Sequence, residues 1–196
     1  HNAVTRREAG GIYRVEKDPL QKVVLFLGRI TFQKGPDYFI EAAAKVLQDM
    51  PEVTFIMAGA GDMMPRMVER VAELGIGRRV HFTGFLTEDD VERIFALSDL
   101  YVMPSVSEPF GISPLEAMLY DIPVIISRQS GVSEVLRHAL KVDFWNVQEL
   151  AGKIMAVLNH PPLAAEMAAR SRDELRHIHW EHAAEKMVNI YNTCLS

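Results

Sequence analysis

Short apolar runs alternate with helical patterns about six times after residue 22, and this alternation limits the possible folds more than any other feature of the sequence. The first run, from Val23 to Gly28, is continuous and rich in β-branched residues, as expected of a strand buried on both faces. Residues 36–50 follow with apolar side chains at helical spacing. Because parallel strands need long, right-handed crossovers, the alternation predicts an α/β fold: a doubly wound parallel sheet of about six strands.

The same patterns place the individual elements. Strands are expected at residues 23–28, 54–58, 80–83, 100–103, 123–126 and 140–142. Helices are expected at residues 36–50, 63–74, 87–97, 113–120, 134–138, 147–158, 163–177 and 181–194. Pro36 suits the first turn of its helix, where a missing N–H costs nothing. Asp62 and Thr87 are of the residue types that cap a helix N-terminus.

Composition narrows the class of protein further. The 196 residues are 48% hydrophobic, which is enough for one large domain or two small ones. The strand and helix count favours one domain over residues 21–196, preceded by a polar linker or arm over residues 1–20. No apolar run approaches the ~20 residues of a membrane helix. The net charge of −5 argues against a nucleic-acid partner, and the single Cys194 excludes an internal disulfide.

Two cations follow the first strand, in the loop that leads into the first helix. Ligands of parallel sheets bind at the carboxyl ends of the strands, so the loops at that edge are where function is expected. Arg29 and Lys34 lie five residues apart in one such loop, which ends at Gly35. Arginine can bind a diphosphate in a bidentate manner and lysine as a point charge, with help from helix N–H groups. A solvated loop with two surface cations is the alternative.

Two carboxylates follow the fourth strand. Glu108 lies in the loop, and Glu116 lies among apolar neighbours in the first turns of the next helix. A carboxylate can accept hydrogen bonds from two vicinal hydroxyls, as on a ribose. Gly111 allows close approach of a ligand, and the N–H groups from Phe110 to Ile112 are open to an anion. The alternative is a helix-capping Glu116 and a solvated Glu108.

The order of these motifs resembles the C-terminal half of retaining GT-B glycosyltransferases. The resemblance rests on the basic loop with Arg29 and Lys34, on the Glu-x7-Glu block from Glu108 to Glu116, and on the Gly59-x-Gly61 turn. It is strongest to glycosyltransferase family 4, also named group 1, with glycogen and starch synthases as more distant relatives. The loop after the fifth strand differs, because Ser130 stands where the family often has the first of two glycines.

The resemblance implies a role for nine residues. Arg29 and Lys34 would bind the donor diphosphate, and Glu116 would hold the ribose. Glu108 would hold the donor sugar. The backbone around it, at Phe110, Gly111 and Ile112, would share this role, and Phe85 and Leu86 would line the base.

The implied reaction transfers a sugar, of hexosyl type, from a nucleoside-diphosphate sugar with retention of the anomeric configuration. Arg29, Lys34 and helix-end amides would stabilise the negative charge of the leaving diphosphate. We expect no cofactor. The sequence contains no Asp-x-Asp, so it requires no metal at the diphosphate.

The resemblance also implies what this chain lacks. The acceptor, whether saccharide, lipid or another molecule, would be bound by an N-terminal domain that these residues do not include, so the fragment would be inactive alone. The expected location is cytoplasmic, with membrane association only through that other domain. Two alternatives stay open: a sugar-nucleotide epimerase of the same scaffold, and a non-catalytic module that binds nucleotide sugars.

Overall fold

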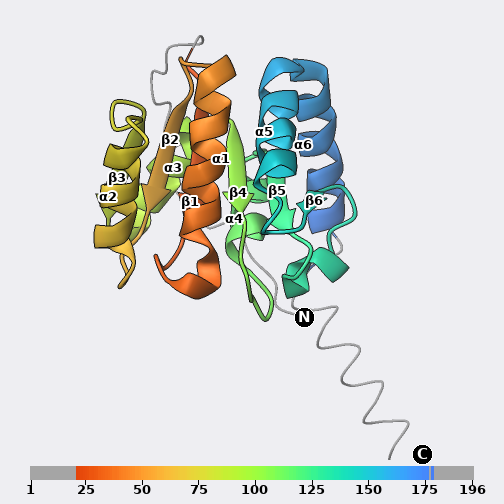
Figure 1. Cartoon of the computed structure of the whole chain (residues 1–196). Helices are drawn as coiled ribbons and strands as arrows, with labels where there is room; N and C mark the ends of the chain where they lie inside the picture. The colour runs from red at the N-terminus through yellow and green to blue at the C-terminus, as the bar shows by residue number, and fades with distance from the viewer. Residues whose placement is uncertain (1–20, 177, 179–196) are drawn as a thin grey trace, which may run out of the picture.

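Six parallel strands form one sheet at the centre of the computed structural model, which describes residues 21–176 and 178 (Figure 1). The strand order is β3-β2-β1-β4-β5-β6, which confirms the predicted doubly wound α/β class. The strands are β1 (Val23–Leu27), β2 (Thr54–Ala58), β3 (Val80–Gly84), β4 (Leu100–Met103), β5 (Val124–Ser127) and β6 (Leu140–Val142). The linker of residues 1–20 and the helix near residues 181–194 lie outside the described residues.

The helices follow the strands along the chain, as the alternation predicts. They are α1 (Pro36–Asp49), α2 (Met64–Glu73), α3 (Glu88–Leu97), α4 (Ser113–Leu119), α5 (Val147–Asn159) and α6 (Pro161–Leu175), with 3₁₀ helices η1 (Phe32–Lys34) and η2 (Gly131–Glu134). Two predicted helix starts are confirmed. Pro36 opens α1, and the Thr87 side chain caps α3 by accepting a hydrogen bond from the Asp90 amide.

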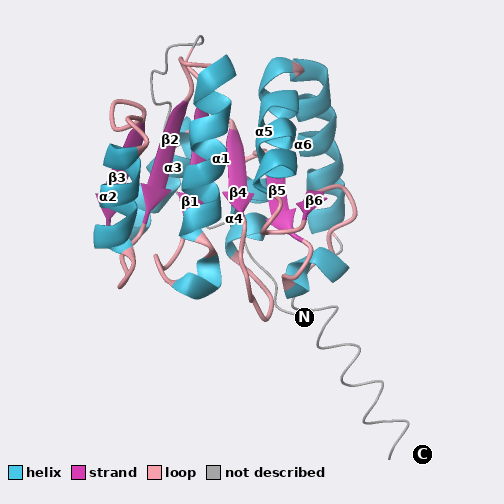
Figure 2. Cartoon of the chain, in the orientation of Figure 1, coloured by secondary structure: helices cyan, strands magenta, loops and turns pink. Residues whose placement is uncertain are grey.

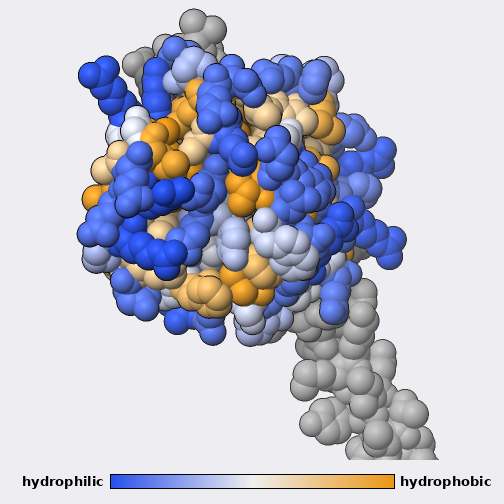
Figure 3. Space-filling model, in the orientation of Figure 1, coloured by the Kyte–Doolittle hydropathy of each residue, from blue (hydrophilic) through white to orange (hydrophobic). Residues whose placement is uncertain are grey.

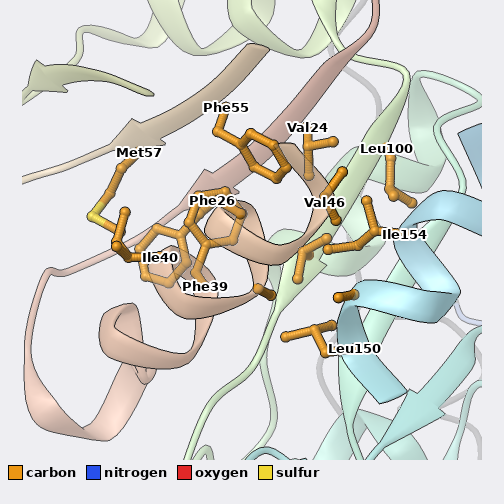
Figure 4. Packing of buried hydrophobic residues seen from close by; sticks show 14 of the residues in the cluster. Val24, Phe26, Phe39, Ile40, Val46, Phe55, Met57, Leu100, Leu150 and Ile154 are labelled. Atoms are coloured by element: carbon orange, nitrogen blue, oxygen red, sulfur yellow. The ribbon is translucent and has the colours of Figure 1, made fainter. Parts of the chain in front are cut away.

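Alternate residues of each strand face opposite sides of the sheet and build two cores. Val24 and Phe26 of β1 pack with α1, α2 and α5, whereas Leu25 between them packs with α3 and α4. In the first core Phe39 lies against Phe26 and Phe55, with ring centroids 5.5 and 5.7 Å apart (Figure 4). Burial on both faces explains why the strands read as continuous apolar runs. The outer face of α1 and α5 is mostly hydrophilic (Figure 3).

The prediction that Asp62 caps the second helix is wrong. The cap position belongs to Met63, and no side chain accepts a hydrogen bond there. The Met63 amide instead donates to the Ile30 carbonyl at 3.1 Å, and the Met64 amide to the Gly61 carbonyl at 3.2 Å. Backbone carbonyls, one from the loop after β1 and one from Gly61, therefore take these donors in place of the Asp62 side chain.

The predicted helix at residues 134–138 is also wrong. The structure has the 3₁₀ helix η2 just before it, at Gly131–Glu134. The Glu174 carboxylate of α6 accepts hydrogen bonds from the Arg137 amide at 2.7 Å and the His138 amide at 3.4 Å. A side chain distant in sequence thus takes the amides that a continuing helix would have paired with its own carbonyls.

All strands run in the same direction, so their carboxyl ends meet at one edge (Figure 2). Glycines let the loops of this edge interlock. A Cβ added at Gly59 would lie 1.9 Å from the Gly28 carbonyl oxygen, and one at Gly131 would lie 2.0 Å from that of Pro109. No side chain fits at those distances, so these glycines allow backbone to contact backbone. Among residues 21–176 and 178, no helix has the length and apolarity needed to cross a bilayer.

Candidate functional site

A cavity of about 540 Å³ opens at the carboxyl edge, between the ends of β1 to β3 and helices α3 and α4. Four of the nine residues singled out from the sequence line it: Arg29, Phe85, Leu86 and Glu116. They come from two loops and one helix. The sheet therefore brings together side chains that lie far apart in the sequence, from Arg29 to Glu116.

Phe85 and Leu86 form the outer part of the cavity wall, directly after β3. The Phe85 side chain is 87% exposed although it lines the cavity, whereas Leu86 packs partly against the second core. An aromatic ring left in solvent beside a cavity offers a flat apolar surface on which a planar group can stack.

Glu116 lies half-buried on α4, where its helical neighbours Leu115 and Ala117 are fully buried. Desolvation by this apolar surrounding raises the pKa of the Glu116 carboxyl. A half-buried carboxylate at a cavity wall can accept hydrogen bonds from hydroxyl groups of a ligand.

Arg29 enters the cavity from the loop after β1 and is exposed. Its guanidinium donates a long hydrogen bond of 3.4 Å to the Gln33 side-chain carbonyl in the same loop. The guanidinium is therefore held only weakly, and its other donors can meet an anion.

Lys34 and Glu108 form an ion pair next to this cavity, without lining it. Lys34 ends η1 and Glu108 follows β4, so the pair joins the loops of two adjacent strands. Both side chains are largely shielded from water, with exposures of 16% and 13%. The same loops are also joined by backbone, since the Val106 amide donates to the Gln33 carbonyl at 2.9 Å.

The loop from Phe110 to Ile112 lies beside Glu108 and likewise does not line the cavity. Gly111 has a φ of 95°, and an added Cβ would lie 3.0 Å from Met103 Cε. The loop after β5 holds this segment by backbone bonds, because the Gly131 amide donates to the Glu108 carbonyl and the Val132 amide to that of Phe110. This close contact requires a glycine at position 131, because an added Cβ would lie 2.0 Å from the Pro109 carbonyl oxygen.

Apart from Glu116, sequence reasoning missed the part of the cavity wall that helices supply. These residues are Glu88, Val91, Glu92 and Phe95 of α3, Ser113 and Leu119 of α4, and Tyr120 after it. The four from α3 recur at helical spacing and share one face, which is a signal that the sequence offered. The rings of Phe95 and Tyr120 stack on each other in this wall, with centroids 5.3 Å apart and planes inclined by 19°.

Within the described part of the chain, no group of three or more His, Cys, Asp or Glu side chains could hold a metal ion. That transfer needs no metal stays a prediction.

Comparison with known proteins identifies the family. A sequence profile of the family described as Glycosyl transferases group 1 matches residues 14–174. An uncharacterized glycosyltransferase of Methanocaldococcus jannaschii is 32% identical over 180 residues, covering 89% of this chain and 46% of that protein. The D-inositol 3-phosphate glycosyltransferase of Rhodococcus jostii is 31% identical over 184 residues, covering 89% and 41%. The chain thus spans less than half the length of these relatives.

Solved structures agree with the sequence comparison. HepE of Anabaena, in complex with UDP and glucose, superimposes with a TM-score of 0.77 at 25% identity, covering 88% of this chain and 48% of HepE. The C-terminal domain of the group 1 glycosyl transferase LpcC from Francisella tularensis superimposes with a TM-score of 0.73 at 25% identity, covering 80% of this chain and 85% of that domain. With this fold and this family match, the chain belongs to the group 1 glycosyltransferases.

Proposed function

We propose that this chain is the donor-binding half of a retaining glycosyltransferase that uses a nucleoside-diphosphate sugar. One observation carries the proposal: Arg29, Phe85, Leu86 and Glu116 line a single cavity at the carboxyl edge of the sheet. An aromatic ring, a carboxylate and a guanidinium are the groups suited to a base, a ribose and a phosphate, respectively.

The order of the strands supports one direction for the bound ligand. The base would lie at Phe85 and Leu86 after β3, the ribose at Glu116, and the diphosphate at Arg29 after β1. The sugar would then extend toward β4, where Lys34 and Glu108 are paired. Lys34 would exchange its carboxylate partner for a phosphate oxygen, and Glu108 would exchange its ammonium partner for a sugar hydroxyl. The backbone at Phe110, Gly111 and Ile112 would help to hold that sugar.

The reaction would place positive charge on the sugar ring and negative charge on the departing diphosphate. Arg29 and Lys34 would stabilise the latter in place of a metal ion. The relatives named above are glycosyltransferases, which supports transfer over epimerisation or a binding role alone. Retention, hexosyl transfer and kinship with family 4 and the glycogen synthases rest on the Glu-x7-Glu block.

The acceptor would be bound by a further, N-terminal domain, with residues 21–196 as the donor-binding domain. The relatives are more than twice as long as the stretch that matches, which supports this division. Whether a saccharide, a lipid or another molecule accepts the sugar depends on that other part.

Titration calorimetry of the 196-residue chain with UDP, GDP and ADP tests the proposal. We expect one of them to bind and to raise the midpoint of thermal unfolding, because a ligand of the folded state stabilises it. Arg29→Ala should weaken this binding about tenfold or more, since it removes a charge-assisted contact to phosphate.

Arg79→Ala is the matched control. Arg79 precedes β3 at the opposite edge of the sheet and pairs with Glu52 at 2.7 Å. Its loss should leave nucleotide affinity unchanged. Absence of binding by all three nucleotides, or equal effects of the two arginine variants, would show the proposal to be wrong.

A further inference from the structure

The hydroxyl of Tyr101 is a polar group buried in the second core, and the proposed function does not use it. It lies within β4 and is fully buried, among Phe95, Leu115 and other apolar side chains of α3 and α4. Burial raises the pKa of its phenol, so the hydroxyl stays protonated and can donate. A buried hydroxyl is costly unless it is paired, which makes its partners informative.

The first partner is the end of β1. Strand β1 pairs with β2 along its whole length, from Val23 to Leu27, but with β4 only at Val24 and Leu25. The strands β1 and β4 therefore part before the carboxyl edge, at the point where the strand order reverses. The Tyr101 hydroxyl spans this opening and donates to the Leu27 carbonyl at 3.2 Å.

The second partner is the start of α4. The Tyr101 ring packs in the same core cluster as Leu115 of this helix, and the Ser113 side chain lies close to the Tyr101 hydroxyl. Glu116 follows Ser113 one turn later. Leu27, Ser113 and Glu116 all line the cavity, as do Gly28 and Arg29 directly after Leu27. One buried tyrosine thus contacts both segments that supply the cation and the carboxylate of the candidate site, through its hydroxyl bond to Leu27 and its packing against α4.

We propose that Tyr101 is a positioning residue, whose hydroxyl holds the Arg29 loop and α4 at the separation at which Arg29 and Glu116 bind the same nucleotide. The proposal rests on the proposed function. Tyr101 acts from beneath the cavity wall, through Leu27 and Ser113, and does not itself line the cavity. Phenylalanine at this position would keep the ring packing against α4 and remove the hydroxyl that binds the Leu27 carbonyl.

Calorimetry of the 196-residue chain with UDP, GDP and ADP tests this role. Tyr101→Phe should weaken binding of the preferred nucleotide roughly three- to tenfold, the effect of one lost hydrogen bond. Tyr38→Phe is the matched control. Tyr38 lies on α1, on the other side of the sheet, and packs against Phe144. Among the described residues, no hydrogen bond joins the Tyr38 hydroxyl to another group. Tyr38→Phe should therefore bind the nucleotide as tightly as the wild type does.

A double-mutant cycle separates positioning from a general loss of stability. If Tyr101 acts through the Arg29 loop, Tyr101→Phe should have a much smaller effect on affinity in an Arg29→Ala background. A merely structural role would give the same fold-change in both backgrounds. Ser113→Ala provides a second cycle with Arg29→Ala, with the same expectation, and decides the question if Tyr101→Phe does not fold.

The outcomes for the two proposals differ. Equal affinity of Tyr101→Phe and wild type, or additive effects in the cycle, would overturn the positioning role and leave nucleotide binding established. Failure of the wild-type chain to bind UDP, GDP and ADP would instead overturn the proposed function, and the positioning role with it.

Discussion

The Lys34 ammonium and the Glu108 carboxylate are paired although they lie 74 positions apart in the chain. The pair lies at the boundary of β1 and β4 and is mostly shielded from water on both sides. A ligand that needs either group must replace the other as its partner. The pair therefore stabilises the free protein and would also set part of the energetic cost of donor binding.

Breaking this pair should destabilise the fold, because each single change leaves a shielded charge without its partner. Lys34→Ala and Glu108→Gln should each lower the free energy of unfolding by about 1–3 kcal/mol, and the double variant by less than the sum. Urea unfolding measures all three. Arg170→Ala breaks the exposed pair with Glu166 and should cost much less, because solvent screens an exposed pair. Equal losses for the buried and exposed pairs would contradict this.

The raised pKa of Glu116 predicts a pH-dependent stability. Between its ordinary value and the raised one, the folded protein binds more protons than the unfolded chain, so stability falls as the pH rises through this window. Glu116→Gln should therefore stabilise the free protein at neutral pH and lose this advantage below the window. Thermal unfolding across pH 4 to 8, roughly, tests the sign.

The same carboxylate gives nucleotide binding its own pH dependence. A protonated Glu116 has lost acceptor capacity for ribose hydroxyls, so affinity should fall as the pH drops through the raised pKa. Glu116→Gln should bind more weakly at neutral pH and show a flatter profile. A variant whose affinity follows the wild type at every pH would remove Glu116 from the site.

Gly59 and Gly152 should respond in opposite ways to alanine. The φ of Gly59 is 133° and its added Cβ would meet the Gly28 carbonyl, so Gly59→Ala should cost about 2 kcal/mol or more. Gly152 lies inside α5 with nothing within 4 Å of an added Cβ. Gly152→Ala should stabilise by about 0.5–1 kcal/mol, since alanine favours helix. Chemical denaturation of both variants measures the contrast.

Phe85 should matter for binding and not for folding. Its ring is 87% exposed, so Phe85→Ala should leave the unfolding midpoint nearly unchanged. Loss of a stacking surface should weaken nucleotide binding by about 1–3 kcal/mol. Phe32→Ala, at a ring that is 64% exposed in η1 and does not line the cavity, is the control. Equal affinities for the two variants would argue against a base at Phe85.

The 196-residue chain should bind its nucleotide without transferring sugar. Its acceptor side is expected to lie in a further domain, so neither transfer nor donor turnover should be seen with UDP- and GDP-sugars. Chromatography of the reaction mixture gives the measurement. Formation of a glycosylated product by this chain would contradict the division into donor and acceptor domains.

Much of the fold was predictable because each strand and helix carries its own pattern. The apolar run of β1 and the helical spacing of apolar residues in α1 are local patterns. Continuous apolar strands that alternate with helices are typical of a buried parallel sheet. Asp62 and residues 134–138 were predicted wrongly for a related reason. The Ile30 carbonyl binds the Met63 amide, and the Glu174 carboxylate binds the Arg137 amide. Both acceptors lie far from these amides in the sequence, so no local pattern predicts the contacts.

The sequence by itself determined that the chain is a parallel α/β domain and that its polar loops follow the carboxyl ends of strands, because periodicity and strand direction are local properties. Only the tertiary structure decided how those loops share the edge. With β1 between β2 and β4, Arg29 lies in a cavity with Phe85 and Glu116, Lys34 pairs with Glu108, and Tyr101 spans the opening between strands. The order of strands depends on packing across the whole sheet, and that packing brings together residues which the sequence keeps far apart.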